Sequence, residues 1–287
     1  MTMLFALFLY FLQFKFRDEI ENRGGEFKNT IFSFTEKEGE VYTLTRWLRA
    51  RKFKYDDVIT MVEEAIECRS EARHEKYYPD PVAALGVDPA IYIDQYPQLY
   101  SGFAKNGCPV YFSKPGVLNI DAIECVTSLS GILNYHWHVM QHDYLQRLLE
   151  YKEKNPSFKR FESVSILDLN HLSTSQLNGR TLGIIKKQSF VDSLCFPETM
   201  NKMIIVNAPR TFSLTWKLIR GWLDQRTANK IEIFSNKSAM QVRLLELIDE
   251  NELPSDYGGK ATDTVTTLRK NFPSGITRIE TETMHLR

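Results

Sequence analysis

Apolar residues recur every three or four positions along the first part of the chain. Residues 43–53 and residues 55–73 both place a stripe of large apolar side chains on one side and charged side chains on the other, which predicts two amphipathic helices. Three prolines then interrupt the pattern between residues 77 and 90. We therefore expect a small helical unit that ends near residue 90.

Beyond residue 90, short runs rich in β-branched residues alternate with longer helical segments. The runs predict strands at residues 109–112, 163–169, 203–207 and 230–234. The segments between most of them predict helices at residues 121–152, 176–193, 213–223 and 237–248. Alternation of this kind is typical of βαβ units, so the expected fold class is α/β with a mostly parallel sheet.

Four parts are expected along the chain. They are an N-terminal segment of uncertain structure, a helical domain, an α/β domain and a C-terminal tail, at residues 1–34, 35–90, 91–262 and 263–287. The first fourteen residues are almost wholly apolar, but they fall short of the ~20 residues of a membrane span and lack the basic leader of a signal peptide. An interfacial anchor, an arm that packs on the protein and an artefact of gene assignment all remain open for them.

Composition excludes several classes of function. Hydrophobic residues make up 43% and charged residues 25%, as in a folded protein, and the 36 basic residues balance the 36 acidic ones. Without a basic surplus we expect no nucleic-acid partner. The four cysteines are scattered, which argues against a disulfide framework or a zinc site and fits a reducing cytosol.

Motifs for catalysis are absent from the sequence. It contains no GxSxG elbow, HExxH pair, Walker loop or GxGxxG after a strand, so we expect no enzyme activity, no catalytic residue and no cofactor. The best metal candidate is the pair His138 and His142, which share one helical face. No carboxylate is phased to complete a site, and we expect no bound metal.

Two features suggest a pocket and a membrane contact. Ser163 and Ser165 alternate with apolar residues, so both hydroxyls lie on one face of a predicted strand, where they need either a backbone partner or a ligand. An apolar stripe that includes Met140 and Tyr144 runs along residues 121–152, for which ordinary packing on the sheet is the simpler explanation. The segment from residue 210 to residue 230 mixes tryptophan with lysine and arginine, as interfacial helices do.

Several segments, taken in order, resemble the CRAL-TRIO family of lipid-binding proteins. The segments are RWLRARKF (46–53), GCPVYF (107–112), SILDL (165–169), FPETMNKMIIVNAPRTFS (196–213), WLD with TANKI (222–231), and ELPSDYGGK (252–260). The resemblance implies a helical domain followed by an α/β domain whose sheet floors a hydrophobic cavity. It also implies a movable gate near residues 221–230, with Trp216, Trp222 and Leu223 beside it.

The resemblance assigns roles to individual residues. Ser163 and Ser165 match hydroxyls that hold a phospholipid phosphate, and Tyr111 lies on a neighbouring matched strand. Lys52 and Arg220 match basic residues that serve phosphoinositide binding. At a position where phosphoinositide-binding members carry Glu, this chain has Lys187, and phosphatidylinositol is therefore a less certain ligand than phosphatidylcholine.

The function expected from the sequence is the binding of one phospholipid as cargo and its transfer between membranes. Such a protein would be a cytoplasmic monomer that touches a membrane surface transiently, with Golgi and endosomal membranes as candidates. Two alternatives stay open: a carrier of a small hydrophobic ligand such as tocopherol or a retinoid, and a lipid-sensing adaptor in phosphoinositide signalling.

Overall fold

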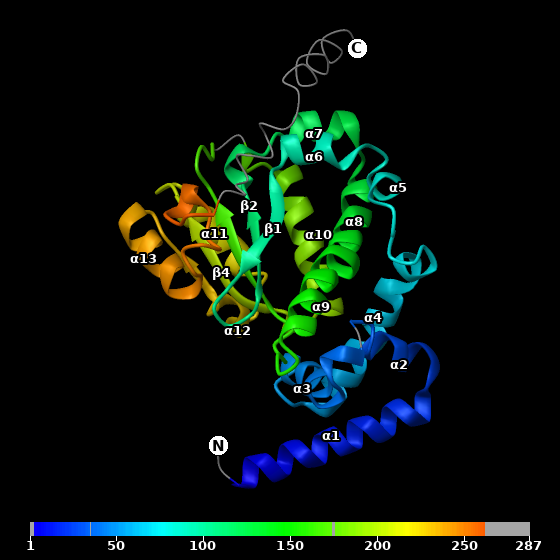
Figure 1. Ribbon diagram of the computed structural model, residues 1–287. Coiled ribbons are helices and arrows are strands. Elements are labelled where there is room, and N and C mark those ends of the chain that lie inside the picture. The colour runs from blue at the N-terminus through cyan, green and yellow to red at the C-terminus, as the bar shows by residue number, and fades with distance from the viewer. Residues whose placement is uncertain (1–2, 35, 174–175, 262–287) are drawn as a thin grey trace.

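The computed structural model describes residues 3–34, 36–173 and 176–261; the predicted tail, 263–287, lies outside them. The first part is helical, with one 3₁₀ turn, η1 (Glu36–Glu38), and the helices α1 (Met3–Arg23), α2 (Gly25–Ile31), α3 (Glu40–Ala50) and α4 (Tyr55–His74). Figure 1 shows these helices together at one end of the molecule. The two helices predicted here are confirmed as α3 and α4, although α3 begins and ends earlier than expected.

Helix α1 is apolar on two sides, and only one of them is covered. Leu12, Phe16 and Ile20 are buried in the core of the helical part, together with Trp47 of α3. The N-terminal segment is therefore an arm that packs on the protein along this side. Its opposite side carries large apolar side chains that remain exposed. Within the described residues, no helix combines the length and the hydropathy needed to cross a membrane.

A five-stranded sheet forms the centre of the second part, and it confirms the α/β fold class. The strands β1 to β5 lie in sequence order across the sheet, at Gln98–Phe103, Pro109–Ser113, Ser163–Asp168, Met200–Val206 and Ile231–Ile233. Strand β1 is antiparallel to β2, whereas the other neighbours are parallel. The four strands predicted from the sequence are all present, and β1 is an additional one.

Helices cover both faces of this sheet. The helices of this part are α5 (Pro81–Leu85), α6 (Pro89–Gln95), α7 (Ile120–Val126), α8 (Leu129–His138), α9 (Tyr144–Lys154), α10 (Gly179–Cys195), α11 (Phe212–Arg220), α12 (Gln225–Ala228) and α13 (Lys237–Leu247). Short turns add η2 (Pro115–Val117), the π-helical η3 (Val139–Asp143) and η5 (Ser255–Tyr257). Helix α5 packs on α8, and α6 packs on α7.

The prediction of one continuous helix over residues 121–152 is wrong. Helix α7 ends at Val126, and α8 starts after Ser128, whose side chain accepts a hydrogen bond from the backbone N–H of Gly131. That bond is an N-cap, which begins a new helix. Leu129, expected on the apolar stripe, is therefore exposed at the start of α8.

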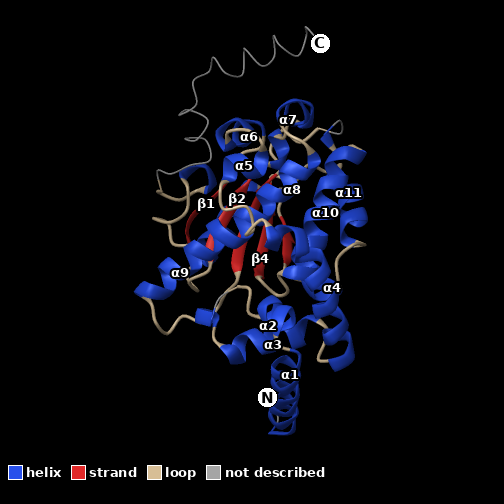
Figure 2. Ribbon diagram, turned by 90° about the vertical axis from the view of Figure 1, so that its right-hand side faces the viewer, coloured by secondary structure: helices blue, strands red, loops and turns tan. Residues whose placement is uncertain are grey.

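The two faces of the sheet differ in how tightly they are packed. On one face, alternate residues of β2, β3 and β4 form a dry core with α13 that includes Phe112, Ile166 and Met240. The other face looks toward α8, α9, α10 and α11; Figure 1 shows α13 and α10 on opposite sides of the strands, and Figure 2 views the strands through the second helix layer. The side chains on this second face are less completely buried.

Buried arginines join the helical part to the α/β part. The Arg46 guanidinium forms a bidentate ion pair with Glu38 and also donates to the carbonyl of Pro197, at 2.8 Å, just before β4. Arg69 of α4 donates to the carbonyl of Cys195, the last residue of α10, at 2.5 Å. Both side chains are almost completely buried, so the two parts share an interior rather than a solvated linker.

Candidate functional site

One row of side chains crosses all five strands on the less tightly packed face. Its members are opposite one another in the strand register and all are half-buried; we call Tyr100, Tyr111, Ser165, Met203 and Ile231 the sheet-face row. On β3 the contrast is clear, because Val164 and Ile166 on the other face are fully buried. The side chains of the row are therefore partly accessible, as those of a surface that receives a ligand must be.

The hydroxyls predicted to bind a headgroup lie at the centre of this row. Ser165 has Tyr111 as its neighbour on β2, and Ser163 shares its face of β3. Among the described residues, neither serine hydroxyl bonds to another protein group, whereas the Tyr111 hydroxyl donates to Gln98 Oε1. Burial raises the pKa of Tyr111 well above its ordinary value, so its hydroxyl stays protonated and can donate.

Helix α10 lies over this face without sealing it. It packs mainly against α4 and α8, and only Thr181, Leu194 and Cys195 along its seventeen residues are buried. The half-buried positions Ile184 and Ile185 are apolar, and Ile184 packs against an apolar cluster that includes Tyr92 and Ile132. An amphiphile with a polar head and apolar tails matches the sheet-face row itself, where a serine hydroxyl lies beside apolar side chains.

Two residues predicted as pocket walls lie to one side of the row. Tyr144 is buried and its ring stacks on Tyr100, with 5.7 Å between the ring centroids. Its other neighbour is Phe34 of the helical part, at 5.4 Å. Met140 is half-buried in the same apolar cluster. Tyr144 thus reaches the row through Tyr100, and the assignment of Met140 and Tyr144 to the pocket remains a prediction.

The predicted gate residues border the row on its other side. Trp216 of α11 packs in an apolar cluster with Leu167 and Met203 of the sheet. Trp222 and Leu223, which follow α11, are half-buried, and the Lys186 ammonium of α10 lies 6.0 Å from the Trp222 ring. Leu214 and Leu218 on the outer side of α11 are exposed, so the helix has an apolar surface on both sides.

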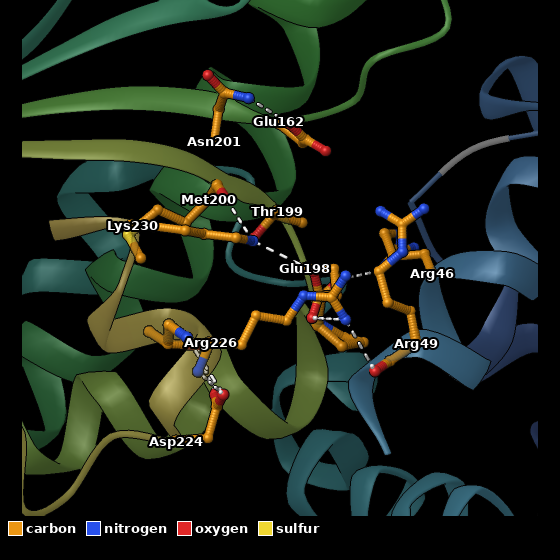
Figure 3. A network of polar contacts seen from close by, with 12 residues as sticks. Arg46, Arg49, Glu162, Glu198, Thr199, Met200, Asn201, Asp224, Arg226 and Lys230 are labelled. Carbon is orange, nitrogen blue, oxygen red and sulfur yellow. Dashed lines mark hydrogen bonds and ion pairs between the residues drawn. The ribbon is translucent and has the colours of Figure 1, made fainter. Parts of the chain in front are cut away.

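A network of charges fixes the segment that follows the gate helix, as Figure 3 shows. The Glu198 carboxylate pairs with Arg226 of α12 at 3.6 Å and with Lys230 at 3.2 Å. Arg226 also donates to the carbonyl of Arg49 in α3, at 3.4 Å, and Lys230 donates to the carbonyl of Met200, at 2.8 Å. We call Glu198, Arg226 and Lys230 the latch. No local pattern predicted the latch, because Glu198 and its partners are far apart along the chain.

The three cations predicted to serve a headgroup are separate from one another. Lys52 is exposed in the turn after α3, Arg220 is exposed at the end of α11, and Lys187 is exposed on α10. Within the described part of the chain, no hydrogen bond or ion pair joins any of them to Ser163 or Ser165. Their roles therefore remain predictions.

The histidines considered as metal ligands bond elsewhere. A ring nitrogen of His138 lies 2.7 Å from the carbonyl oxygen of Tyr78, and one of His142 lies 3.1 Å from that of Tyr77. His136 contacts Asp192 of α10 at 2.7 Å. Among the described residues, no group of three or more His, Cys, Asp or Glu side chains is arranged to hold a metal ion.

Comparison with known proteins places this site within a family. The model of the CRAL/TRIO domain matches residues 94–259, which include all five strands and the gate segment. The phosphatidylinositol/phosphatidylcholine transfer protein SFH12 of Arabidopsis thaliana is 31% identical over 231 residues, which cover 79% of this chain but 41% of the relative's own length. The chain therefore spans well under half of that relative.

Two further matches cover most of both partners. The SEC14 cytosolic factor of Candida glabrata is 30% identical over 230 residues, which make up 76% of this chain and 70% of that protein. The crystal structure of Sfh5 covers 97% of this chain and 98% of its own with a TM-score of 0.66. Its sequence identity is only 16%, so this likeness shows the fold alone.

Proposed function

The chain belongs to the CRAL/TRIO domain family, and we propose that it binds a phospholipid over the sheet-face row and transfers it between membranes. The relatives named above support a phosphatidylcholine or phosphatidylinositol cargo, because SFH12 is named for the transfer of both lipids. The expected location is cytoplasmic with peripheral membrane association. We expect the chain to act as a monomer, and lipid transfer needs no covalent chemistry.

The observation that carries this proposal is the pair of unpartnered hydroxyls on β3. Both serines are half-buried, and a hydroxyl that loses water without gaining another partner costs free energy, so a ligand that displaces water from this face must supply that partner. The hydroxyls of Ser163 and Ser165 can donate to phosphate oxygens, and Met203 and Ile231 of the same row offer apolar contacts beside them. A phospholipid satisfies both requirements with one molecule.

Exchange needs α11 to move, and the latch holds the segment that follows it. Trp216 occupies part of the sheet face, so a two-chain lipid requires it to withdraw. The Arg226 side chain is 43% exposed, but Glu198 is only 11% exposed and Lys230 22%, so breaking the latch costs more than the ~0–1 kcal/mol of a fully exposed ion pair. The latch can therefore hold the gate closed in water and release it at a membrane, where Leu214 and Leu218 find an apolar partner.

A lipid analysis of the purified chain tests the proposal. We expect one phospholipid per protein by native mass spectrometry, and movement of labelled phosphatidylcholine from donor to acceptor vesicles. The double variant Ser163→Ala/Ser165→Ala is expected to lose most of the bound phospholipid. The matched control is Ser238→Ala on the exposed start of α13, which should behave as the unchanged chain does.

The same measurements discriminate between the ligand classes. If the double variant retains its cargo, the ligand lacks a phosphate, and a carrier of a small hydrophobic molecule is the better description. If the chain carries no lipid and moves none, the proposed function is wrong. Transfer without any effect on a coupled lipid kinase would argue against a signalling adaptor.

Lys187 tests the choice between the two cargo lipids. Replacing Lys187 by Glu introduces the acceptor that an inositol ring can use, and we expect phosphatidylinositol binding to rise relative to phosphatidylcholine. Lys237→Glu, at the exposed start of α13, is the control for a general effect of charge. An unchanged ratio of the two bound lipids would show that Lys187 does not select the headgroup.

A further inference from the structure

The exposed side of α1 is a continuous apolar surface. At about 100° per residue, Leu4, Leu7, Phe8, Phe11 and Phe14 fall within one arc of roughly 120°. Their exposed fractions are high, from 48% for Phe8 to 82% for Leu4. No acidic residue occurs before Asp18, so this surface has no negative charge of its own. We call these five residues the α1 apolar face.

The apolar face is held outward by contacts on the other side of the helix. Leu12, Phe16 and Ile20 are buried in the core of the helical part. The Gln13 amide donates to the Thr45 hydroxyl of α3 at 2.6 Å. Because α1 is anchored in this way, the apolar face cannot rotate into the protein and stays directed toward its surroundings.

A basic hollow lies next to the same helix. It has a volume of about 400 Å³ and is lined by three cations, Arg49, Lys159 and Arg160, against one carboxylate, Glu162. Arg49 is one turn of α3 beyond Thr45, the residue that Gln13 of α1 contacts, so this cation of the hollow lies on the side of α3 that α1 approaches. The positive hollow and the apolar helix are thus neighbours on one end of the molecule.

We propose that the α1 apolar face and the basic hollow together form a docking surface for an anionic bilayer. An interfacial helix buries its apolar side chains at the level of the headgroups, while neighbouring cations meet lipid phosphates and acidic headgroups. The pairing of apolar and basic surfaces favours a membrane over a second copy of the chain, whose corresponding surface would place like charges together. This surface is distinct from α11 and does not depend on which cargo the chain carries.

Co-sedimentation of the full chain with vesicles tests the apolar half of this surface. We expect the double variant Leu7→Glu/Phe11→Glu to bind at least about tenfold more weakly to vesicles that contain phosphatidylserine, because two large apolar side chains no longer enter the interface. Val242→Glu, which changes an equally exposed apolar residue on α13, should leave binding unchanged. Equal binding by the α1 variant and the unchanged chain would overturn the proposal.

A charge variant tests the basic half. Each cation near an anionic leaflet contributes about fivefold to binding, so Arg49→Gln/Lys159→Gln should bind phosphatidylserine vesicles roughly twentyfold more weakly and lose the preference over pure phosphatidylcholine. Lys237→Gln on α13 is the matched control. Amide hydrogen exchange of residues 4–14 gives an independent readout: vesicles should protect them in the unchanged chain.

The remaining outcomes also decide the matter. If sedimentation equilibrium shows that the chain dimerises and that Leu7→Glu/Phe11→Glu makes it monomeric with no change in vesicle binding, the face binds a second copy and the proposal is wrong. Extraction of cargo from every variant separates this result from the proposed function. A variant that still carries its phospholipid but no longer sediments with vesicles has lost docking alone.

Discussion

Two ion pairs with the same geometry should differ greatly in what they contribute to stability. Glu38 and Glu40 each accept two hydrogen bonds from an arginine, and each pair has its shortest N–O distance at 2.6 Å. The Glu38 and Arg46 side chains are 0% and 3% exposed, whereas those of Glu40 and Arg17 are 44% and 46% exposed. Burial is therefore the variable that separates these two pairs.

The expected magnitudes follow from that difference. Glu38→Gln leaves the Arg46 guanidinium buried without a counter-charge, which costs ~3–5 kcal/mol of unfolding free energy. Glu40→Gln removes an exposed pair and costs ~0–1 kcal/mol. The larger loss is a sizeable share of the ~5–15 kcal/mol by which a typical domain is stable.

Urea unfolding followed by circular dichroism measures both variants. Because Arg46 also donates to the Pro197 carbonyl, the loss should appear in the transition that separates the helical part from the sheet. The double variant Glu38→Leu/Arg46→Met should recover much of it, since no buried charge is left unpaired. The reasoning is refuted if Glu38→Gln and Glu40→Gln lower stability by the same amount, because burial would then not govern the value of the pair.

Three further predictions concern single residues. Hydrogen bonds from Arg243 lower the pKa of Glu232 from 4.5 to about 2, so its stabilisation is complete above pH 4.5 and is lost as the pH falls toward 2; acid unfolding of Glu232→Gln should lack this component. A hydrogen bond from the Cys195 thiol lowers the pKa of Cys68 to about 7, so its rate of alkylation should rise through pH 7, and Cys195→Ala should move that midpoint up toward 9. Gly183→Ala on α10 meets no atom within 4 Å and should raise stability by ~1 kcal/mol in thermal unfolding; a loss would show that α10 is packed more closely than its surroundings indicate.

Periodicity predicted the elements whose burial is regular and missed those whose burial is not. Burial alternates from residue to residue along β3 and is nearly continuous along β2. Both strands lie at the residues that the sequence predicted. All six residues of β1 are half-buried, so its polar and apolar positions carry no period of two, and the strand was not predicted. Ser128 is a residue type that commonly caps a helix N-terminus, so the break before α8 was visible in the sequence. The prediction missed it because the apolar spacing continues across Ser128.

The candidate site likewise contains residues that the sequence could predict and residues that it could not. The face shared by Ser163 and Ser165 follows from alternation along one strand, and the structure places both there. The partners from other elements could not be predicted, because contacts such as Phe34 with Tyr144, or Arg226 with the Arg49 carbonyl, join residues more than a hundred positions apart. No local pattern encodes such pairs, which exist only once the fold is formed.

The helical part explains why one face of the sheet stays open. Helix α13 packs against the strands in an apolar core. Helix α10 instead packs against α4 of the helical part, where Arg69 donates a hydrogen bond to its last carbonyl. A helix end needs partners for its final carbonyls, and here a fully buried guanidinium from another domain supplies one. We infer that this contact holds α10 away from the sheet. Held in this way, α10 leaves Ser163 and Ser165 on β3 only partly covered, as the proposed phospholipid binding requires.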